Sequence, residues 1–190
     1  MSLFKRSGTL AILLLVTLFA FAAGAAEFQA DMTIKSEQGG DINGKVFVRG
    51  SSMRQELETP MGEQVVIVDG DAEIMYVLLP AQKMYVQRDN TQVVLDDSED
   101  PEKRLAAQGK VTKMGTEKIQ NYDCDKYHVV NNDKNMGEST LWISRELNYP
   151  LKVYVDNPKD KATIIYSNIV EKKLEDHLFV LPSDYSKLEM

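Results

Sequence analysis

The feature that most constrains the fold is a succession of short segments rich in Val, Ile, Tyr and Thr, which begins at Phe28. In the first segment, Phe28, Ala30, Met32 and Ile34 alternate with polar residues, which is the period of a half-buried strand. Ten further segments have this character, at residues 44–49, 52–58, 63–68, 73–79, 83–88, 110–118, 122–131, 139–144, 152–156 and 162–170. The sequence therefore predicts about eleven strands.

The breaks between these segments are short and carry turn residues, such as Gly39-Gly40, Asp69-Gly70 and Asn157-Pro158. Connections of this length make neighbouring strands pair antiparallel. The chain also lacks the alternation of strands with long amphipathic helices that a parallel sheet requires. We therefore expect a mainly β protein built on one large, curved, meandering antiparallel sheet.

Residues 89–109 interrupt the strand pattern and predict a short helical insertion. Asp100 suits the N-cap, Pro101 the first helical position and Gly109 the C-cap. The acidic run from Asp96 to Glu102 lacks the glycine and the ligand spacing of a calcium loop, so it is interpreted as a solvated helix start. We expect the helix to cover the concave side of the sheet.

The N-terminus has the pattern of a secretory signal peptide over residues 1–25. Lys5 and Arg6 precede an apolar stretch that is shorter than the roughly 20 residues of a spanning helix, and small residues follow it. Cleavage after Ala25 would leave residues 26–190 as a single domain in the periplasm or outside the cell, not an integral membrane protein. A retained membrane anchor is the alternative.

Charge and cysteine content exclude several classes of protein. The net charge of -7 argues against nucleic acid and against anionic membrane surfaces as main partners, because both require a basic face. Cys124 is the only cysteine, so no intramolecular disulfide is available. Asp123 and Asp125 flank it and disfavour a thiolate, which predicts a buried structural residue.

No motif for catalysis or for metal binding is present. His128 and His177 have neither each other nor Cys124 at metal-ligand spacing, and no nucleophile elbow, phosphate loop or dinucleotide fingerprint occurs. We expect no catalytic residue, no metal and no cofactor. A hydrolase that uses one histidine as its base and a distant serine remains an alternative.

Methionine and aromatic residues are abundant in the strand segments, and Val65–Val68 and Met75–Leu79 are apolar at consecutive positions. Such strands bury both faces, so each face needs a cover. Two interpretations are open: a self-filled core under the helix, or an apolar pocket for an acyl chain.

The stretches Gly44–Glu56, Val65–Gly70 and Ile74–Pro80 resemble the LolA/LolB-like superfamily of periplasmic lipoprotein carriers, most of all its small uncharacterised secreted branch. The same order of motifs continues through Tyr122–Tyr127, Trp142–Ser144 and Leu178–Tyr185. The resemblance implies an unclosed β-barrel that wraps a hydrophobic cavity, with a short helical lid. It implies a non-enzymatic binding protein that shelters a lipid or an acylated protein for envelope transport. The alternative is a module that binds an envelope protein or senses envelope stress.

For such a cavity the predicted lining residues are apolar side chains from several strand segments: Met32, Ile34, Phe47, Met53, Met75, Val77, Met84, Trp142 and Tyr154. In the carriers, a basic residue at the end of a strand contacts the lid. The resemblance assigns this role to Arg49.

Overall fold

The computed structural model describes residues 26–89 and 100–188, so the predicted signal peptide at residues 1–25 lies outside the described residues. Eleven long strands and one short strand form a single sheet: β1 (Glu27–Ser36), β2 (Gly40–Arg49), β3 (Ser52–Thr59), β4 (Gly62–Asp69), β5 (Ile74–Leu79), β6 (Met84–Asp89), β7 (Gly109–Ile119), β8 (Tyr122–Asn131), β9 (Glu138–Ser144), β10 (Pro150–Asn157), β11 (Asp160–Glu171) and β12 (Ser186–Lys187). The helical turns are η2 (Pro80–Gln82), α2 (Pro101–Ala106) and η3 (Asp176–Phe179). Within the described ranges, no helix is long and apolar enough to cross a bilayer.

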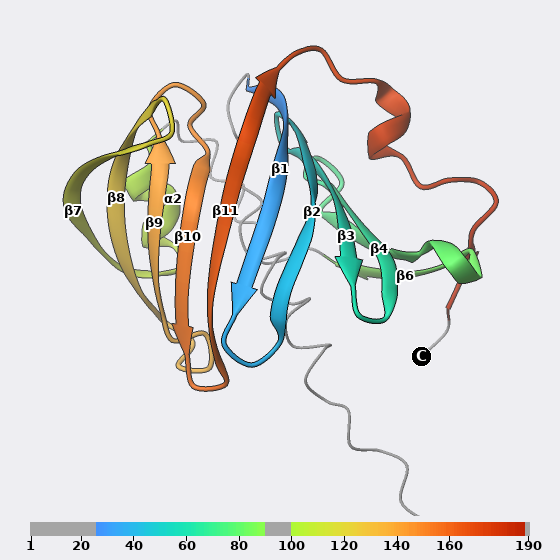
Figure 1. Cartoon of the computed structure of the whole chain (residues 1–190), viewed down its shortest axis with the longest axis horizontal. Coiled ribbons are helices and arrows are strands. Elements are labelled where there is room, and N and C mark those ends of the chain that lie inside the picture. Colours follow the sequence, from blue (N-terminus) through green and yellow to red (C-terminus); the bar gives the residue numbers. More distant parts are fainter. Residues whose placement is uncertain (1–25, 90–99, 189–190) are drawn as a thin grey trace, which may run out of the picture.

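The sheet consists of two antiparallel meanders joined side by side. Its strand order is β12-β6-β5-β4-β3-β2-β1-β11-β10-β9-β8-β7, so the meanders β1–β6 and β7–β11 meet where β1 pairs with β11 (Figure 1). Ten strand pairs are antiparallel, and β12 pairs with β6 in parallel. The prediction of a mainly β, curved antiparallel sheet is therefore confirmed, with β12 as an added strand and β1–β11 as the pairing that joins the two meanders.

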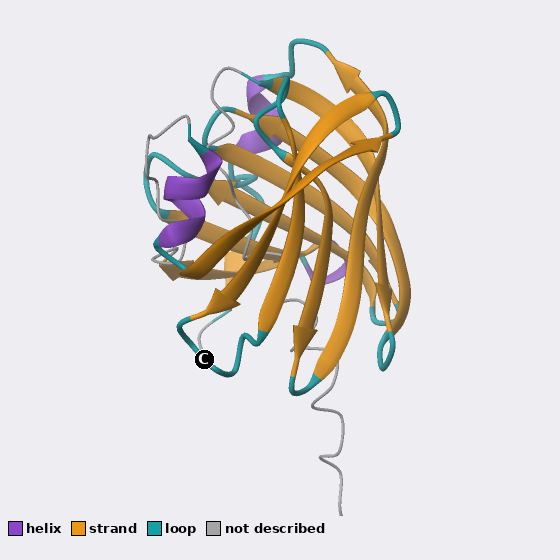
Figure 2. Cartoon of the chain, turned by 90° about the vertical axis from the view of Figure 1, so that its left-hand side faces the viewer, coloured by secondary structure: helices purple, strands orange, loops and turns teal. Residues whose placement is uncertain are grey.

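The sheet curves around one side without closing, and α2 lies within the curve (Figure 2). The side that faces α2 is called the concave face and the opposite side the outer face. Leu105 of α2 is fully buried in the main core, together with Phe28, Met32 and Ile34 of β1. The alternation read from the sequence of β1 thus places its apolar side chains against the core.

Strand β4 is buried on both faces, as its consecutive apolar residues predict. Val66 and Val68 belong to the main core on the concave face, whereas Val65 and Ile67 form a second cluster with Leu78 on the outer face. Leu181 and Tyr185 of the C-terminal segment pack on that second cluster, and β12 adds to the edge of β6. The C-terminal segment 172–188 is therefore the cover of the outer face here.

The predicted helix is present as α2, but its end differs from the prediction. The Asp100 carboxylate accepts a hydrogen bond from the Glu102 amide at 3.0 Å, and Pro101 occupies the first helical turn. Gly109 does not cap the helix, because it is the first residue of β7 and pairs with Asn131. A Cβ at this position would lie 2.1 Å from the Val130 carbonyl oxygen, so close strand approach explains the glycine.

Candidate functional site

The concave face is built from rows of side chains that cross the strands. Residues directly opposite on paired strands share a face, so the register defines each row. One row consists of Phe28, Val48, Met53, Val68 and Met75. The adjacent row consists of Ala30, Val46, Gln55, Val66, Val77 and Val86. Apart from Gln55, the second row therefore holds only Ala and Val, whereas the first row alternates Val with Phe or Met.

Burial on this face falls toward β5 and β6. The row members on β1 to β4 are fully buried, whereas those on β5 and β6 are half-buried. We call this half-buried set the β5–β6 strip, which consists of Met75, Val77, Leu79, Met84 and Val86. It is an apolar surface that retains contact with solvent beside a closed core.

The structure brings six of the nine predicted lining residues to the concave face. Met32, Ile34 and Met53 lie in its buried part, and Met75, Val77 and Met84 lie in the β5–β6 strip.

Phe47, Trp142 and Tyr154 lie on the outer face and do not line the same surface. Phe47 is opposite Gln29, and Tyr154 is opposite Thr163, both of which alternate with concave residues. Their hydrophobicity predicted burial, but it did not predict which face of the sheet they occupy. Successive residues of a strand alternate between the two faces, so an error of one residue in the register reverses the assignment.

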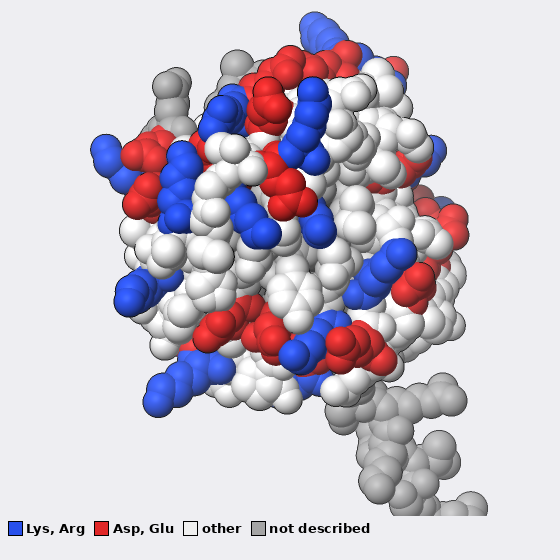
Figure 3. Space-filling view, turned by 60° about the vertical axis from the view of Figure 1, so that its left-hand side comes forward, with Lys and Arg blue, Asp and Glu red and all other residues white. Residues whose placement is uncertain are grey.

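Trp142 has a polar role on the outer face. Its ring lies between two cations, with Lys126 Nζ at 4.6 Å and Lys152 Nζ at 4.3 Å from the ring centroid. Its Nε1 donates a hydrogen bond to Glu117 Oε2 at 2.7 Å, and this bond lowers the pKa of Glu117. Figure 3 shows this side of the molecule, where Lys and Arg are interspersed with Asp and Glu. Trp142 thus stabilises the packing of β8, β9 and β10.

Arg49 contacts a helical turn, but not the one on the concave side. Its guanidinium pairs with Asp176 at 2.5 Å and lies 4.4 Å from the ring centroid of Phe179, both in η3. Arg54 donates to the Leu178 carbonyl oxygen of the same turn at 3.3 Å. Arg49 therefore holds the C-terminal segment on the outer face. Its partners among the described residues lie in η3 and not in α2, and its contact with a lid stays a prediction.

Tyr149, which the sequence analysis missed, occupies the middle of the concave side. It comes from the β9–β10 connection, is 1% exposed and packs edge-on against Phe28 at 5.2 Å and Tyr166 at 5.7 Å. Burial raises the pKa of Tyr149 and raises that of Tyr166 to about 12. No periodic signal marks a loop residue that folds back onto the sheet, so sequence reasoning had no means to find it.

Gln55, also missed, is the one glutamine among the buried polar residues of the described chain. It is 1% exposed on the concave face, and its Oε1 has no hydrogen-bond partner. Its Nε2 reaches only the Met53 sulfur, at 3.5 Å. A signal was available, because a lone amide interrupts the alternation of Met53 and Leu57 in β3.

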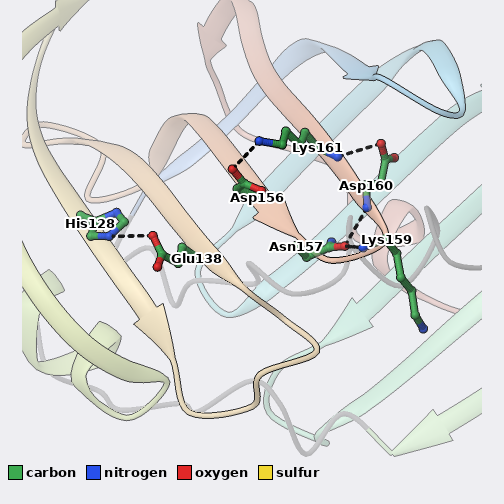
Figure 4. Close-up of polar contacts among 7 residues, drawn as sticks. All are labelled: His128, Glu138, Asp156, Asn157, Lys159, Asp160 and Lys161. Atoms are coloured by element: carbon green, nitrogen blue, oxygen red, sulfur yellow. Dashed lines mark hydrogen bonds and ion pairs between the residues drawn. The ribbon is translucent and has the colours of Figure 1, made fainter.

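The two histidines each face a carboxylate at the surface. His128 Nε2 lies 3.3 Å from Glu138 Oε2 on the neighbouring strand, near the hairpin where Asp156 pairs with Lys161 (Figure 4). His177 Nδ1 lies 3.0 Å from Glu175 Oε2. Cys124 is fully buried as expected, and burial raises its pKa to about 11. Among the described residues, no group of three potential ligands could hold a metal ion.

Comparison with protein families gives one match, to a domain of unknown function, DUF4412, over residues 28–148. That range is more than half of the chain. None of the curated proteins matches it.

Solved structures show the same fold at low sequence identity. An uncharacterized conserved protein from Thermus thermophilus is 13% identical with a TM-score of 0.61, over 94% of this chain and 98% of that one. MucB in the Pseudomonas aeruginosa MucA/MucB complex is 18% identical with a TM-score of 0.54, over 86% of this chain and 58% of that one. The LolA superfamily protein NE2245 from Nitrosomonas europaea is 12% identical with a TM-score of 0.45, over 92% and 98%. The family match confirms the expected uncharacterised domain, and the structures with TM-scores above 0.5 share its fold.

Proposed function

Because the chain belongs to the DUF4412 family of domains of unknown function, its surface is the guide to its role, and we propose that it is a non-enzymatic carrier that binds the acyl chain of a lipid or an acylated protein. The ligand lies on the concave face, and the β5–β6 strip is its point of entry. The N-terminal 25 residues direct the chain to the periplasm or out of the cell and are removed.

The single observation that carries this proposal is the half-buried state of the β5–β6 strip. Strands β5 and β6 are covered on the outer face by Leu181 and Tyr185, so their apolar side chains there are accounted for. On the concave face Met75 and Val77 only border the main core. This apolar surface is rich in methionine and continuous with a closed core. An acyl chain can bind to it and be shielded from water there.

The energy available is sufficient for a carrier. Burial of an acyl chain yields about 0.8 kcal/mol per methylene, so about ten methylenes yield roughly 8 kcal/mol before the costs of association. Release then needs no covalent chemistry. It needs only that the chain be transferred to another apolar surface.

The test is native mass spectrometry of the exported protein, purified without detergent, in the wild type and in Met75→Asp. We expect a bound mass in the lipid range on the wild type that organic extraction removes. The variant should lose it, because a carboxylate in the strip makes burial of an acyl chain unfavourable. Met61→Asp is the matched control, since Met61 is 81% exposed in the β3–β4 turn and should leave the bound mass unchanged.

An apo wild-type mass, with no uptake on incubation with lipid, would contradict the carrier. Circular dichroism of M75D must match the wild type, so that loss of ligand is not loss of fold.

A second candidate function is the binding of an envelope protein by the same sheet. The likeness to MucB favours it, because MucB was solved in complex with MucA. This chain spans about 58% of that MucB chain, so the likeness concerns the sheet domain alone. Recovery of one specific partner by the wild type and not by M75D, together with a lipid-free mass, would favour this function over the carrier.

A further inference from the structure

We propose that Gln55 is a recognition point for a hydrogen-bond donor on the ligand, so that the carrier prefers acyl chains attached through an amide to those attached through an ester. This inference rests on the proposed function and names the chemistry of the group to which the acyl chain is attached.

The residues on both sides of Gln55 in its row are apolar. Its neighbours across the strands are Val46 on β2 and Val66 on β4, both fully buried. Its Oε1 accepts no hydrogen bond, and its Nε2 has only the thioether of Met53 at 3.5 Å, which is a weak acceptor. A buried amide in this state loses its hydrogen bonds to water without replacement, and native proteins rarely leave such a group unexplained.

Other polar atoms lie beside Gln55. The Tyr149 hydroxyl lies 3.5 Å from the same Met53 sulfur, so the thioether has the amide and the phenol as its polar neighbours. Tyr149 also packs edge-on against Tyr166, with ring centroids 5.7 Å apart, and both side chains are buried. The concave face thus carries a small polar group of Gln55, Tyr149 and Tyr166 inside an apolar surface.

The position of Gln55 connects it to the proposed entry point. Val66 lies opposite Gln55, and Val77 of the β5–β6 strip lies opposite Val66. Two strand spacings, about 10 Å, separate Gln55 from Val77. In this valine row, Val66 is the one residue between them and is fully buried, so the proposed ligand reaches Gln55 from the strip only by displacing its side chain.

The unpartnered oxygen determines which ligand is preferred. An acceptor needs a donor, and an amide N–H supplies one, whereas an ester has none. Both groups offer a carbonyl to Nε2, so the difference between them isolates Oε1. The gain of one buried hydrogen bond corresponds to about tenfold in affinity.

The experiment compares N-methyldodecanamide with methyl dodecanoate, which have the same length and shape. Each competes with a fluorescent acyl probe for the wild type, for Gln55→Leu and for Ser139→Val. Ser139 is the matched control, because its Oγ is also buried without a partner but lies on β9, away from the valine row.

We expect the wild type and S139V to bind the amide about tenfold more tightly than the ester, and Q55L to bind both equally with its ester affinity retained. Without ligand, Q55L should also unfold at a higher urea concentration than the wild type, because an unpaired amide has been replaced by an apolar group.

Two results overturn the inference while leaving the carrier intact: equal binding of amide and ester by the wild type, or a preference that persists in Q55L. Failure of the wild type to bind either probe is a different result, because it contradicts the proposed function itself.

Discussion

Arg49 at the end of β2 and Asp176 in η3 form an ion pair of 2.5 Å across 127 residues of sequence. Asp176 is 93% exposed, so the pair is a surface contact, and Phe179 adds a ring under the same guanidinium. Together they attach the C-terminal segment to the outer face, where it covers the second apolar cluster.

Arg49→Ala should loosen this attachment without unfolding the sheet. Surface pairs and exposed cation–π contacts each contribute up to about 1 kcal/mol, so we expect a loss of roughly 1 kcal/mol in unfolding free energy. Hydrogen exchange of amides 176–188 should accelerate. Asp176→Asn retains the Phe179 contact and should give a smaller acceleration; unchanged exchange in R49A would show that Arg49 does not hold the segment.

Removal of residues 172–190 should cause self-association. Val65, Ile67 and Leu78 are buried beneath Leu181 and Tyr185, and truncation returns this apolar surface to water. Size-exclusion chromatography with light scattering should show oligomers that increase with concentration. Leu181→Asp in the full chain should have the same effect more weakly, and a truncated protein that stays monomeric would contradict the covering role.

Stability should fall at alkaline pH through Tyr166. Its folded pKa is about 12, above the value of 10 in the unfolded chain, so the folded state holds the proton more tightly. The stabilisation is complete below pH 10 and is lost as pH rises toward 12, by about 3 kcal/mol for two pKa units. Urea unfolding from pH 9 to pH 12 measures it.

Tyr166→Phe is the control for this window. The unfolding free energy of the variant should decline less steeply with pH than that of the wild type, because the Tyr166 hydroxyl is absent. Some decline remains, because lysines with raised pKa values and Tyr149 still contribute. Equal slopes in the two proteins would contradict the assignment to Tyr166.

Cys124 should resist alkylation in the folded protein. Its thiol is fully buried, and desolvation raises its pKa to about 11, so almost no thiolate is present at neutral pH. Maleimide labelling followed by mass spectrometry should give no adduct at neutral pH and one adduct in concentrated guanidinium chloride. Rapid labelling without denaturant would show that β8 opens locally.

The strand pattern was predictable because it depends on neighbours in sequence. The eleven predicted segments correspond to β1–β11, and Asp100 and Pro101 marked the start of α2 through local capping chemistry. Gly109 shows the limit of such reasoning: the same residue type suits a helix end and a close strand contact, and only its distance to Val130 distinguishes them. β12 was not predictable, since two residues carry no periodicity and depend on the edge of β6.

The candidate site was predictable only in part. Met75, Val77 and Met84 were identified by their apolar character, and so were Phe47, Trp142 and Tyr154, which lie on the other face. Arg49 was identified as a strand-end cation, but its partner came from the C-terminus.

A curved antiparallel sheet with a short helix follows from the sequence, because alternation and turn chemistry act over a few residues. Three features depend on the folded molecule: which face each side chain occupies, the pairing of β1 with β11, and the approach of Tyr149 and Gln55 to the same Met53 sulfur on the concave side. These depend on register and on contacts between distant segments, where a shift of one residue exchanges the two faces of a strand.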